Sequence, residues 1–181
     1  MLLEKLVQAD TRLSSALRIG NSKSFQRYVC IFFAHSGDSW FWLAGLILIW
    51  SISKGPWHST AAFLAVGLSL LAVVVLILKF SIRRPRPESD WGHIYRATDP
   101  HSFPSGHAAR AAAIAVMALE TGPIWFAILT LTWAPLVGIA RIRLGVHYIS
   151  DVLVGSLIGV LIGIIANILN PFIINLLPFV F

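Results

Sequence analysis

Cysteine is almost absent from this chain, and charged residues are scarce. The single cysteine, Cys30, has no partner for an internal disulfide, and no spacing of cysteine and histidine residues resembles a zinc site. Only 12% of the 181 residues are charged, whereas soluble domains carry about a quarter. These shortages exclude disulfide chemistry and structural zinc, and they argue against a water-soluble fold.

Hydrophobic residues are what the chain has in excess. They make up 57% of the sequence and the mean hydropathy is +0.78, which is typical of a protein embedded in a bilayer. The net charge of +6 then favours contact with anionic lipid or a phosphorylated ligand, and we expect no nucleic-acid partner. No repeat, linker or low-complexity tract divides the chain, so we expect a single membrane-embedded domain over residues 1–181.

The first 36 residues are too polar or too short to cross a membrane. Leucine recurs at helical spacing at Leu2, Leu6, Leu13 and Leu17. Polar and charged residues separate these leucines, which predicts an amphipathic helix lying in the membrane interface. Residues 25–34 are apolar, but a spanning helix needs about 20 residues. We therefore expect 1–36 to form an interfacial N-terminal segment, with 25–34 either in the interface or packed against the helices that follow.

Five longer apolar segments follow, and each predicts a helix that crosses the bilayer. They cover residues 39–53, 60–78, 105–120, 123–140 and 152–169. The sequence thus predicts an all-α integral membrane helix bundle with about five transmembrane helices, or six if 25–34 also crosses. Gly155, Gly159 and Gly163 predict close approach of a neighbouring backbone. We expect Asn170-Pro171 to end the last helix.

The polar stretch 79–103 is unlike the rest of the chain, and we expect function there. Lys79 ends an apolar segment, and Arg86 follows seven residues later between two prolines, Pro85 and Pro87. Prolines restrict the local backbone, so the guanidinium of Arg86 can be aimed at a ligand. Taken alone, the same residues also fit a snorkelling lysine and an ordinary basic patch beside the membrane.

A second pattern, Pro104-Ser105-Gly106-His107, opens an alanine-rich helix. Ser105 is a natural N-cap, and the backbone N–H groups of a helix N-terminus make an anion site. Gly106 weakens a first turn and is better explained by close approach of a ligand. His107 would lie beside that ligand. The alternative is a capped helix with an incidental histidine.

A third pattern joins the last two apolar segments, with Arg141, then His147, then Asp151. If the helix includes His147, Asp151 lies one turn further on, where its carboxylate accepts the Nδ1–H of the imidazole. Nε2 is then unprotonated and nucleophilic. The alternative is an interfacial contact between His147 and Asp151, beside an arginine that anchors the helix.

The order of the apolar segments brings the three patterns together. With five spans, all of them emerge on the same side of the membrane. A site there holds three cations, a helix N-terminus and two histidines, which suits a phosphoryl group and needs no metal ion. We therefore expect no metal site and no cofactor.

The three patterns resemble the signature of the type 2 phosphatidic acid phosphatase superfamily, which includes lipid phosphatases and vanadium haloperoxidases. By this resemblance His147 would attack phosphorus and form a phosphohistidine, Asp151 would orient it, and His107 would protonate the leaving oxygen. The phosphate oxygens would be held by Lys79, Arg86, Ser105, Gly106 and Arg141. The resemblance covers a catalytic core of residues 79–151 and departs from the family pattern at Ala140, where the family usually has a serine.

The resemblance implies metal-independent hydrolysis of the terminal phosphate of a membrane lipid phosphate or diphosphate. Phosphatidic acid, phosphatidylglycerol phosphate, polyprenyl phosphates or diphosphates and lipid-linked sugar phosphates present the same terminal group, so the substrate stays open. Two alternatives remain. One is a phospholipid-binding or transport protein that keeps the anion cage without catalysis, and the other is a vanadate-dependent haloperoxidase. The sequence indicates no oligomeric state.

Positive charges outside the three patterns predict which way the protein faces. With five spans, the N-terminal segment shares a side with the patterns. That segment carries Lys5, Arg12, Arg18, Lys23 and Arg27. The opposite side has only Lys54. Because short basic flanks stay in the cytoplasm, we expect a multi-pass protein of the cell membrane whose active site faces the cytoplasm.

Overall fold

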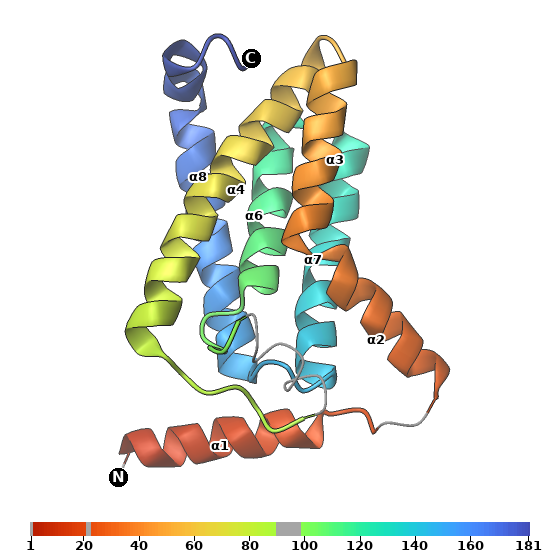
Figure 1. The fold of residues 1–181 in the computed structure, drawn as a ribbon, viewed down its shortest axis with the longest axis vertical. Coiled ribbons are helices and arrows are strands. Elements are labelled where there is room, and N and C mark those ends of the chain that lie inside the picture. Colours follow the sequence, from red (N-terminus) through yellow and green to blue (C-terminus); the bar gives the residue numbers. More distant parts are fainter. Residues whose placement is uncertain (1, 21–22, 90–98) are drawn as a thin grey trace.

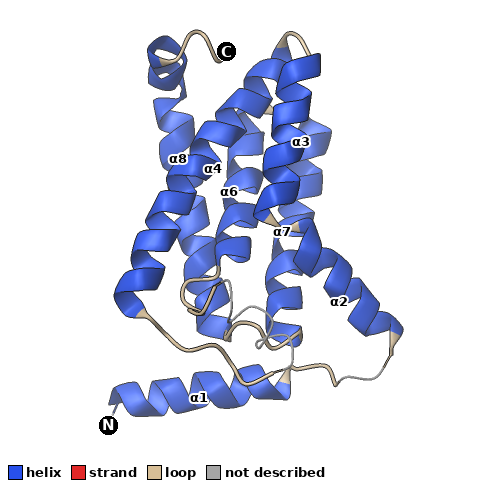
Figure 2. Cartoon of the chain, in the orientation of Figure 1, coloured by secondary structure: helices blue, strands red, loops and turns tan. Residues whose placement is uncertain are grey.

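Helices make up most of the described chain. The computed structural model describes residues 2–20, 23–89 and 99–181 (Figure 1). The helices in this part are α1 (Leu2–Ala16), α2 (Phe25–Ser36), α3 (Ser39–Ile52), α4 (Pro56–Ile82), α6 (Gly106–Thr121), α7 (Ile124–Arg143) and α8 (Ile149–Leu176). The described residues contain no strand, and Pro85 and His101 form an isolated β-bridge (Figure 2). The predicted all-α class is confirmed.

Helix α6 lies at the centre of the bundle and packs against α4, α7 and α8. Its sequence explains this position, because a run of alanines gives a thin helix that several neighbours can approach. Most of these small side chains are fully buried, among them Ala109, Ala111 and Ala113. The Ser105-Gly106-His107 pattern at the start of this helix therefore lies inside the protein.

The glycines of α8 allow α6 to come into backbone contact. A Cβ atom at Gly155 would lie 2.6 Å from the carbonyl oxygen of Ser105, and one at Gly159 would overlap the carbonyl group of Ala109. Real side chains do not tolerate such distances, so both positions need glycine. The close approach that the four-residue spacing predicts is confirmed, and it fixes the start of α6 against the start of α8.

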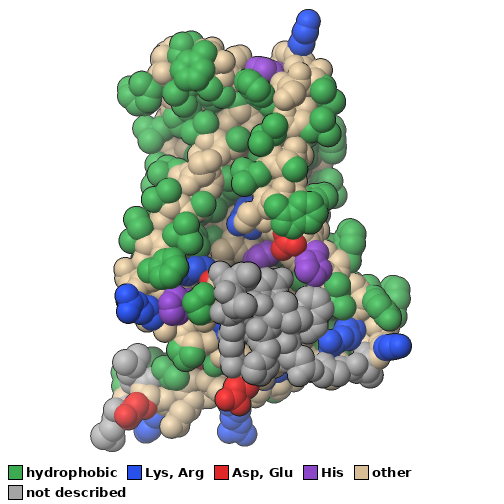
Figure 3. Space-filling view, in the orientation of Figure 1, with side chains coloured by type: hydrophobic (Ala, Val, Ile, Leu, Met, Phe, Trp, Pro, Cys, Tyr) green, Lys and Arg blue, Asp and Glu red, His purple; other side chains and the backbone are tan. Residues whose placement is uncertain are grey.

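Three helices, α4, α7 and α8, are long and apolar enough to cross a membrane, and α3 is a shorter apolar helix. Their outer faces expose large hydrophobic side chains such as Ile77, Ile128 and Leu157. Figure 3 shows hydrophobic side chains over most of the upper part of the molecule, with charged side chains and histidines gathered mainly toward the lower end. This distribution fits a membrane bundle, and the number of crossings stays a prediction.

Helix α8 continues through Asn170-Pro171 to Leu176, so the predicted stop at that pair is wrong. A proline in a helix removes one hydrogen bond and bends the helix without necessarily ending it. In an apolar environment the backbone groups beyond it still need helical partners, because water is not available to replace them. Figure 1 shows the end of α8 turned away from the axis of the rest of the helix.

The N-terminal segment forms two helices that differ in their contacts. Helix α1 lies across the end of the bundle (Figure 1), with Leu6 and Leu13 exposed and Ser14 buried. Helix α2 packs on α7 through a small cluster that includes Cys30 and Ala34. Helix α1 is the amphipathic helix that the sequence predicts. Residues 25–34 pack against the bundle, which is one of the two predicted alternatives.

Candidate active site

Four helix ends meet at one end of the bundle. The last turns of α4 and α7 lie beside the first turns of α6 and α8, next to α1 (Figure 1). The three sequence patterns therefore occupy one end of the molecule, as the order of the segments predicts. Residues 90–98 of the polar stretch lie outside the described residues.

Lys79 and Arg86 are two buried cations that contact the same carboxylate, Asp99. Lys79 lies in the last turn of α4 and is 5% exposed, and Arg86 in the following loop is 3% exposed. The Lys79 Nζ atom lies 2.6 Å, and the Arg86 Nη2 atom 2.7 Å, from the same oxygen, Oδ2 of Asp99. The two cations thus converge on a point where an oxyanion fits.

Asp99 lies in the polar loop beside the site and is not among the residues expected to hold phosphate. Its carboxylate is an internal anion between Lys79 and Arg86, and its backbone carbonyl also accepts a hydrogen bond from Arg86 Nε at 2.6 Å. The side chain is 38% exposed, so it can leave the two cations at less cost than a fully buried group. Sequence spacing carries no signal for this contact, because Asp99 lies 20 residues from Lys79 in a loop.

The N-terminus of α6 is built as the sequence predicts. Ser105 is the N-cap and is fully buried, and its side chain accepts a hydrogen bond from the backbone N–H of Ala108. Its own N–H donates to the carbonyl of Asp151 at 3.0 Å. Among the described residues, a Cβ atom at Gly106 would meet Val75, at 3.6 Å, which is an ordinary contact. Packing against these residues therefore does not require glycine here, and close approach of a ligand stays a prediction.

His147 and Asp151 face each other, although the helix begins after the histidine. Helix α8 starts at Ile149, so His147 lies just outside it. Its Nδ1 atom is 3.6 Å from Asp151 Oδ2, which is longer than a hydrogen bond. That oxygen accepts the backbone N–H of Tyr148 at 2.9 Å. On the other side of the ring, Nε2 lies 3.3 Å from Nη1 of Arg86.

Burial and nearby cations keep the His147 imidazole neutral. Burial is the larger cause, and the positive charges of Arg141, Arg86 and Lys79 add to it, so the pKa of His147 lies well below its ordinary value. A neutral imidazole has a lone pair for nucleophilic attack. The structure therefore places a buried histidine, whose neutral form is favoured, beside the guanidinium of Arg86.

Arg141 is a fully buried cation in the last turn of α7, and it is the largest of the fully buried side chains. The residue before it, Ala140, packs in the apolar cluster with Cys30, Ala34 and Leu144. These neighbours are apolar, which suits alanine, a side chain without the hydroxyl of the family serine.

His107 pairs with Asp38, an acid at the start of α3. Its Nε2 atom lies 2.8 Å from Oδ1 of Asp38, and the other carboxylate oxygen lies 3.0 Å from Nδ1 of His35. Asp38 stands at the N-cap position of α3, as the sequence suggests, yet its side chain makes no capping hydrogen bond. Asp38 and His107 are 69 positions apart in the sequence, which explains why no sequence pattern reveals the pair.

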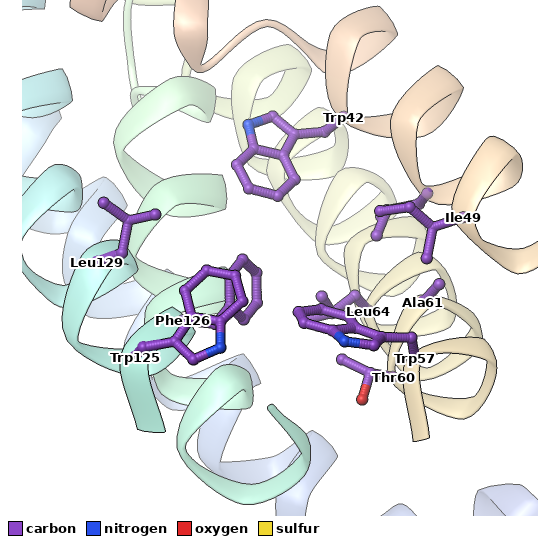
Figure 4. A pocket seen from close by; sticks show the side chains of 10 residues that line it. Trp42, Ile49, Trp57, Thr60, Ala61, Leu64, Trp125, Phe126 and Leu129 are labelled. Atoms are coloured by element: carbon purple, nitrogen blue, oxygen red, sulfur yellow. The ribbon is translucent and has the colours of Figure 1, made fainter. Parts of the chain in front are cut away.

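A cavity of about 280 Å³ connects the polar site to an apolar wall. Lys79, Gly106 and His107 line it at one end, and Leu68, Leu71 and Val75 line it further along α4. Another cavity of about 280 Å³ lies among α3, α4 and α7 at the opposite end of the bundle, around Trp42, Trp57 and Trp125 (Figure 4). The described residues that line this second cavity are apolar or aromatic side chains and Thr60, none of them an acid or a base.

Metal ligands do not gather in the described part of the chain. Among residues 2–20, 23–89 and 99–181, no group of three or more histidine, cysteine, aspartate or glutamate side chains is arranged to hold a metal ion. The buried positive charges belong to lysine and arginine. That the chemistry needs no metal stays a prediction.

Comparison with known proteins identifies relatives. The PAP2 superfamily profile matches residues 60–173. An undecaprenyl-diphosphatase of Sulfolobus acidocaldarius is 30% identical over 135 residues, which is 71% of this chain and 63% of that protein. A lipid A 1-phosphatase of Porphyromonas gingivalis is 37% identical over 98 residues, or 52% of this chain and 20% of that protein. This chain thus covers less than two thirds of either relative.

Solved structures show the same fold. The crystal structure of a transmembrane PAP2-type phosphatidylglycerolphosphate phosphatase from Bacillus subtilis superposes with a TM-score of 0.76 at 26% identity, covering 93% of this chain and 88% of that one. LpxE of Aquifex aeolicus gives a TM-score of 0.68 at 27% identity, over 86% of this chain and 92% of that one. The likeness extends beyond the profile match to nearly the whole helical bundle.

Proposed function

The chain belongs to the PAP2 superfamily, and from that premise we propose that it hydrolyses the terminal phosphate of a membrane lipid through a phosphohistidine. The observation that carries this proposal is the position of His147. Its imidazole is buried and neutral, and its Nε2 atom lies 3.3 Å from a guanidinium that shares an anion with Lys79. A phosphoryl group bound by these cations comes within reach of the nucleophile.

The first half of the reaction transfers the phosphoryl group to the protein. His147 Nε2 attacks phosphorus as the bond from phosphorus to the lipid oxygen breaks, and His107 gives a proton to that oxygen. Negative charge on the other phosphate oxygens is stabilised by Lys79, Arg86 and Arg141. The hydroxyl of Ser105 and the N–H of Gly106 add donors at the N-terminus of α6.

The second half releases phosphate. Neutral His107 takes a proton from water as the water oxygen attacks the phosphohistidine, and the bond from phosphorus to Nε2 breaks. This restores the protonated His107 and the neutral His147, so the cycle closes without any other reactant. Asp151 holds its place beside His147 throughout, because its carboxylate also accepts the N–H of Tyr148.

A lipid substrate is favoured by the shape of the cavity. The same cavity that reaches Lys79 and His107 continues between leucine and valine side chains of α4. A phosphate at the polar end can therefore keep its apolar chain along the helix. We propose a multi-pass protein of the cell membrane, with the bilayer and a phosphorylated lipid as its partners.

A non-catalytic anion-binding protein fits the site less well. Binding an anion requires cations and N–H donors, whereas this site also has two histidines. Asp38 contacts one of them at 2.8 Å and Asp151 faces the other at 3.6 Å. A nucleophile and an acid, each with a carboxylate close by, serve no purpose in a protein that only holds phosphate.

Phosphate release by purified protein tests the proposal. The substrates are phosphatidic acid, phosphatidylglycerol phosphate, a polyprenyl phosphate and a polyprenyl diphosphate in detergent micelles, with and without vanadate. We expect release from at least one lipid, inhibition by vanadate, and an acid-labile labelled phosphoenzyme that His147→Ala lacks. A protein that binds vanadate but releases no phosphate from any of these lipids would be a binding protein instead.

A further inference from the structure

Asp38 makes no local contact of the kind that its position suggests. It stands where an aspartate caps a helix, but its carboxylate does not bond the first turn of α3. The carboxylate is instead 15% exposed and lies between two imidazoles, with His107 Nε2 at 2.8 Å and His35 Nδ1 at 3.0 Å. Asp38 does not cap its own helix and contacts His107, 69 positions away in the sequence. Its side chain therefore acts at His107.

The corner between α2 and α3 is fastened to α6 around His107. Arg110, on the same helix as His107, donates one hydrogen bond to the carbonyl of Gly37 at 2.5 Å and another to the hydroxyl of Ser39. A Cβ atom at Gly37 would come within 3.4 Å of the His107 ring and 3.0 Å of Val137. Within this corner, Gly37 packs against the imidazole ring of His107, and the Asp38 carboxylate contacts its Nε2 atom.

Charge around His107 makes this contact more than a matter of packing. Arg110 lies on its own helix, while Arg141 and His147 face it from α7 and from the loop before α8. Burial and these two guanidinium groups oppose a positive charge on the His107 ring. Asp38 supplies the negative charge from the α2–α3 corner, and His35, on the far side of the carboxylate, shares it.

The Asp38 carboxylate stays ionised in this position. Burial alone raises a carboxyl pKa, but the hydrogen bonds to His107 and His35 outweigh burial and hold the pKa of Asp38 well below its usual range. The negative charge beside His107 is therefore present across the pH range in which a histidine takes up a proton.

We propose that Asp38 is a positioning residue for the general acid His107. It fixes Nε2–H toward its own carboxylate, and it stabilises the charged imidazolium that the acid step requires. The proton given to the leaving oxygen then comes from Nδ1, and the Nε2–H bond to Asp38 is kept. After transfer the imidazole is neutral and Asp38 remains ionised. This inference rests on the proposed phosphatase chemistry, but its charge component can be measured without turnover.

The first test follows the charge state of His107 directly. Protein labelled with ¹⁵N-histidine is titrated by NMR in detergent, and His107 is assigned by the loss of its signals in His107→Gln. We expect the midpoint of its titration to fall by about one to three pH units in Asp38→Asn, as for loss of an adjacent opposite charge. An unchanged midpoint overturns the inference even if the protein proves to be a phosphatase.

The second test follows turnover with two leaving groups. With a lipid phosphate, which has a poor leaving group, we expect kcat of Asp38→Asn to fall about 100-fold, the usual size of an acid–base contribution. With p-nitrophenyl phosphate we expect a fall of less than about tenfold. KM should change little for either substrate, and Asp38→Glu should restore part of kcat.

Ser39→Ala is the matched control. It removes a contact of the same corner with Arg110 but leaves the carboxylate in place, so a purely structural role predicts the same losses in both variants. Equal losses in Ser39→Ala and Asp38→Asn, or equal losses with both leaving groups, overturn the inference. If wild-type protein releases no phosphate at all, the proposed function fails, and the NMR titration still decides whether Asp38 controls the charge of His107.

Discussion

Arg84 holds the carboxylate of Asp151 from the side opposite His147. Its Nη1 atom lies 2.7 Å from Asp151 Oδ1, and its Nη2 atom lies 2.7 Å from Oδ2 of Asp10 on α1. The guanidinium also lies over the ring of Tyr148, 4.0 Å from the ring centre. One arginine thus connects the helix that lies across the end of the bundle to the acid beside the proposed nucleophile.

Replacement of Arg84 by alanine should destabilise the protein by about 3 kcal/mol, because it leaves the fully buried Asp151 without its charged partner. We expect kcat to fall as well, since the carboxylate then loses one of the contacts that hold it beside His147. The free energy of unfolding in a denaturing-detergent titration and phosphate release measure the two effects.

Asp10→Asn provides the comparison for that prediction. It removes the outer charge of the same network but leaves the contact between Arg84 and Asp151 at 2.7 Å. We expect a loss of about 1 kcal/mol, the size of one hydrogen bond, and nearly unchanged kcat. An Asp10 variant as damaged as Arg84→Ala would show that α1, rather than Arg84, holds Asp151 beside His147.

The two histidines should respond differently to substitution. His147→Ala should abolish turnover with every substrate, because no other group forms the phosphoenzyme. His107→Ala should reduce turnover of a lipid phosphate by 100-fold or more, and that of a nitrophenyl phosphate much less, because only a poor leaving group needs a proton. Steady-state rates with both substrates check this. Equal losses for the two substrates would falsify the assignment of His107 as the acid.

The convergence of Lys79 and Arg86 on Asp99 predicts competition between this carboxylate and phosphate. In Asp99→Asn we expect vanadate and phosphate to bind about tenfold more tightly, equivalent to 1.4 kcal/mol. Without anions the variant should unfold at a lower temperature than wild type, because two buried cations lose their counter-ion. Inhibition constants and thermal unfolding with and without vanadate provide the measurements.

Glu88→Gln is a suitable control for Asp99, since Glu88 is an exposed acid of the same loop. Its inhibition constants should match those of wild type. If Asp99→Asn leaves anion affinity unchanged and lowers only kcat, Asp99 acts with bound substrate and does not compete with it.

Sequence patterns predicted the site wherever the determinants were local. The spacing of Gly155 and Gly159 marked the contact with α6, and Ser105 marked a capped helix start. Both follow from the short-range geometry of a helix, in which residues at four-residue spacing share a face. The helix order then placed distant patterns at one end, because each span reverses the direction of the chain.

The missing parts of the site depend on contacts that local geometry does not encode. Asp38, Arg84 and Asp99 each reach their partner from a loop or corner, and nothing in the spacing of their neighbours distinguishes them from ordinary loop charges. Pro171 was misread for a related reason. The rule that proline ends a helix holds where water can solvate the freed backbone groups, and it weakens along an apolar helix.

Activity should survive removal of divalent metal ions. Lysine and arginine side chains and the N-terminus of α6 surround the proposed phosphate position, so the charge that a metal often provides comes from the protein. We expect unchanged rates after dialysis against EDTA, measured by phosphate release with a metal-free buffer as control. Lost activity that Mg²⁺ restores would contradict this expectation.

The predicted orientation in the membrane depends on where α1 lies. The positive-inside prediction needs the N-terminal cations and the site to share a side, and a crossing by α2 would have separated them. The contact of Asp10 with Arg84 at 2.7 Å places α1 at the end of the bundle that holds the site, so this requirement is met whatever α2 does. The basic N-terminal segment then favours a site that faces the cytoplasm.

Cysteine labelling tests that orientation with positions from both ends of the bundle. In a Cys30→Ala background, Glu88→Cys introduces a thiol at an exposed loop position beside the site, and Lys54→Cys introduces one in the exposed turn between α3 and α4. An impermeant maleimide should modify Lys54→Cys in intact cells, and Glu88→Cys only after the membrane is permeabilised. The reverse result would place the site outside, and the N-terminal cations would then act locally on anionic lipid rather than set the topology.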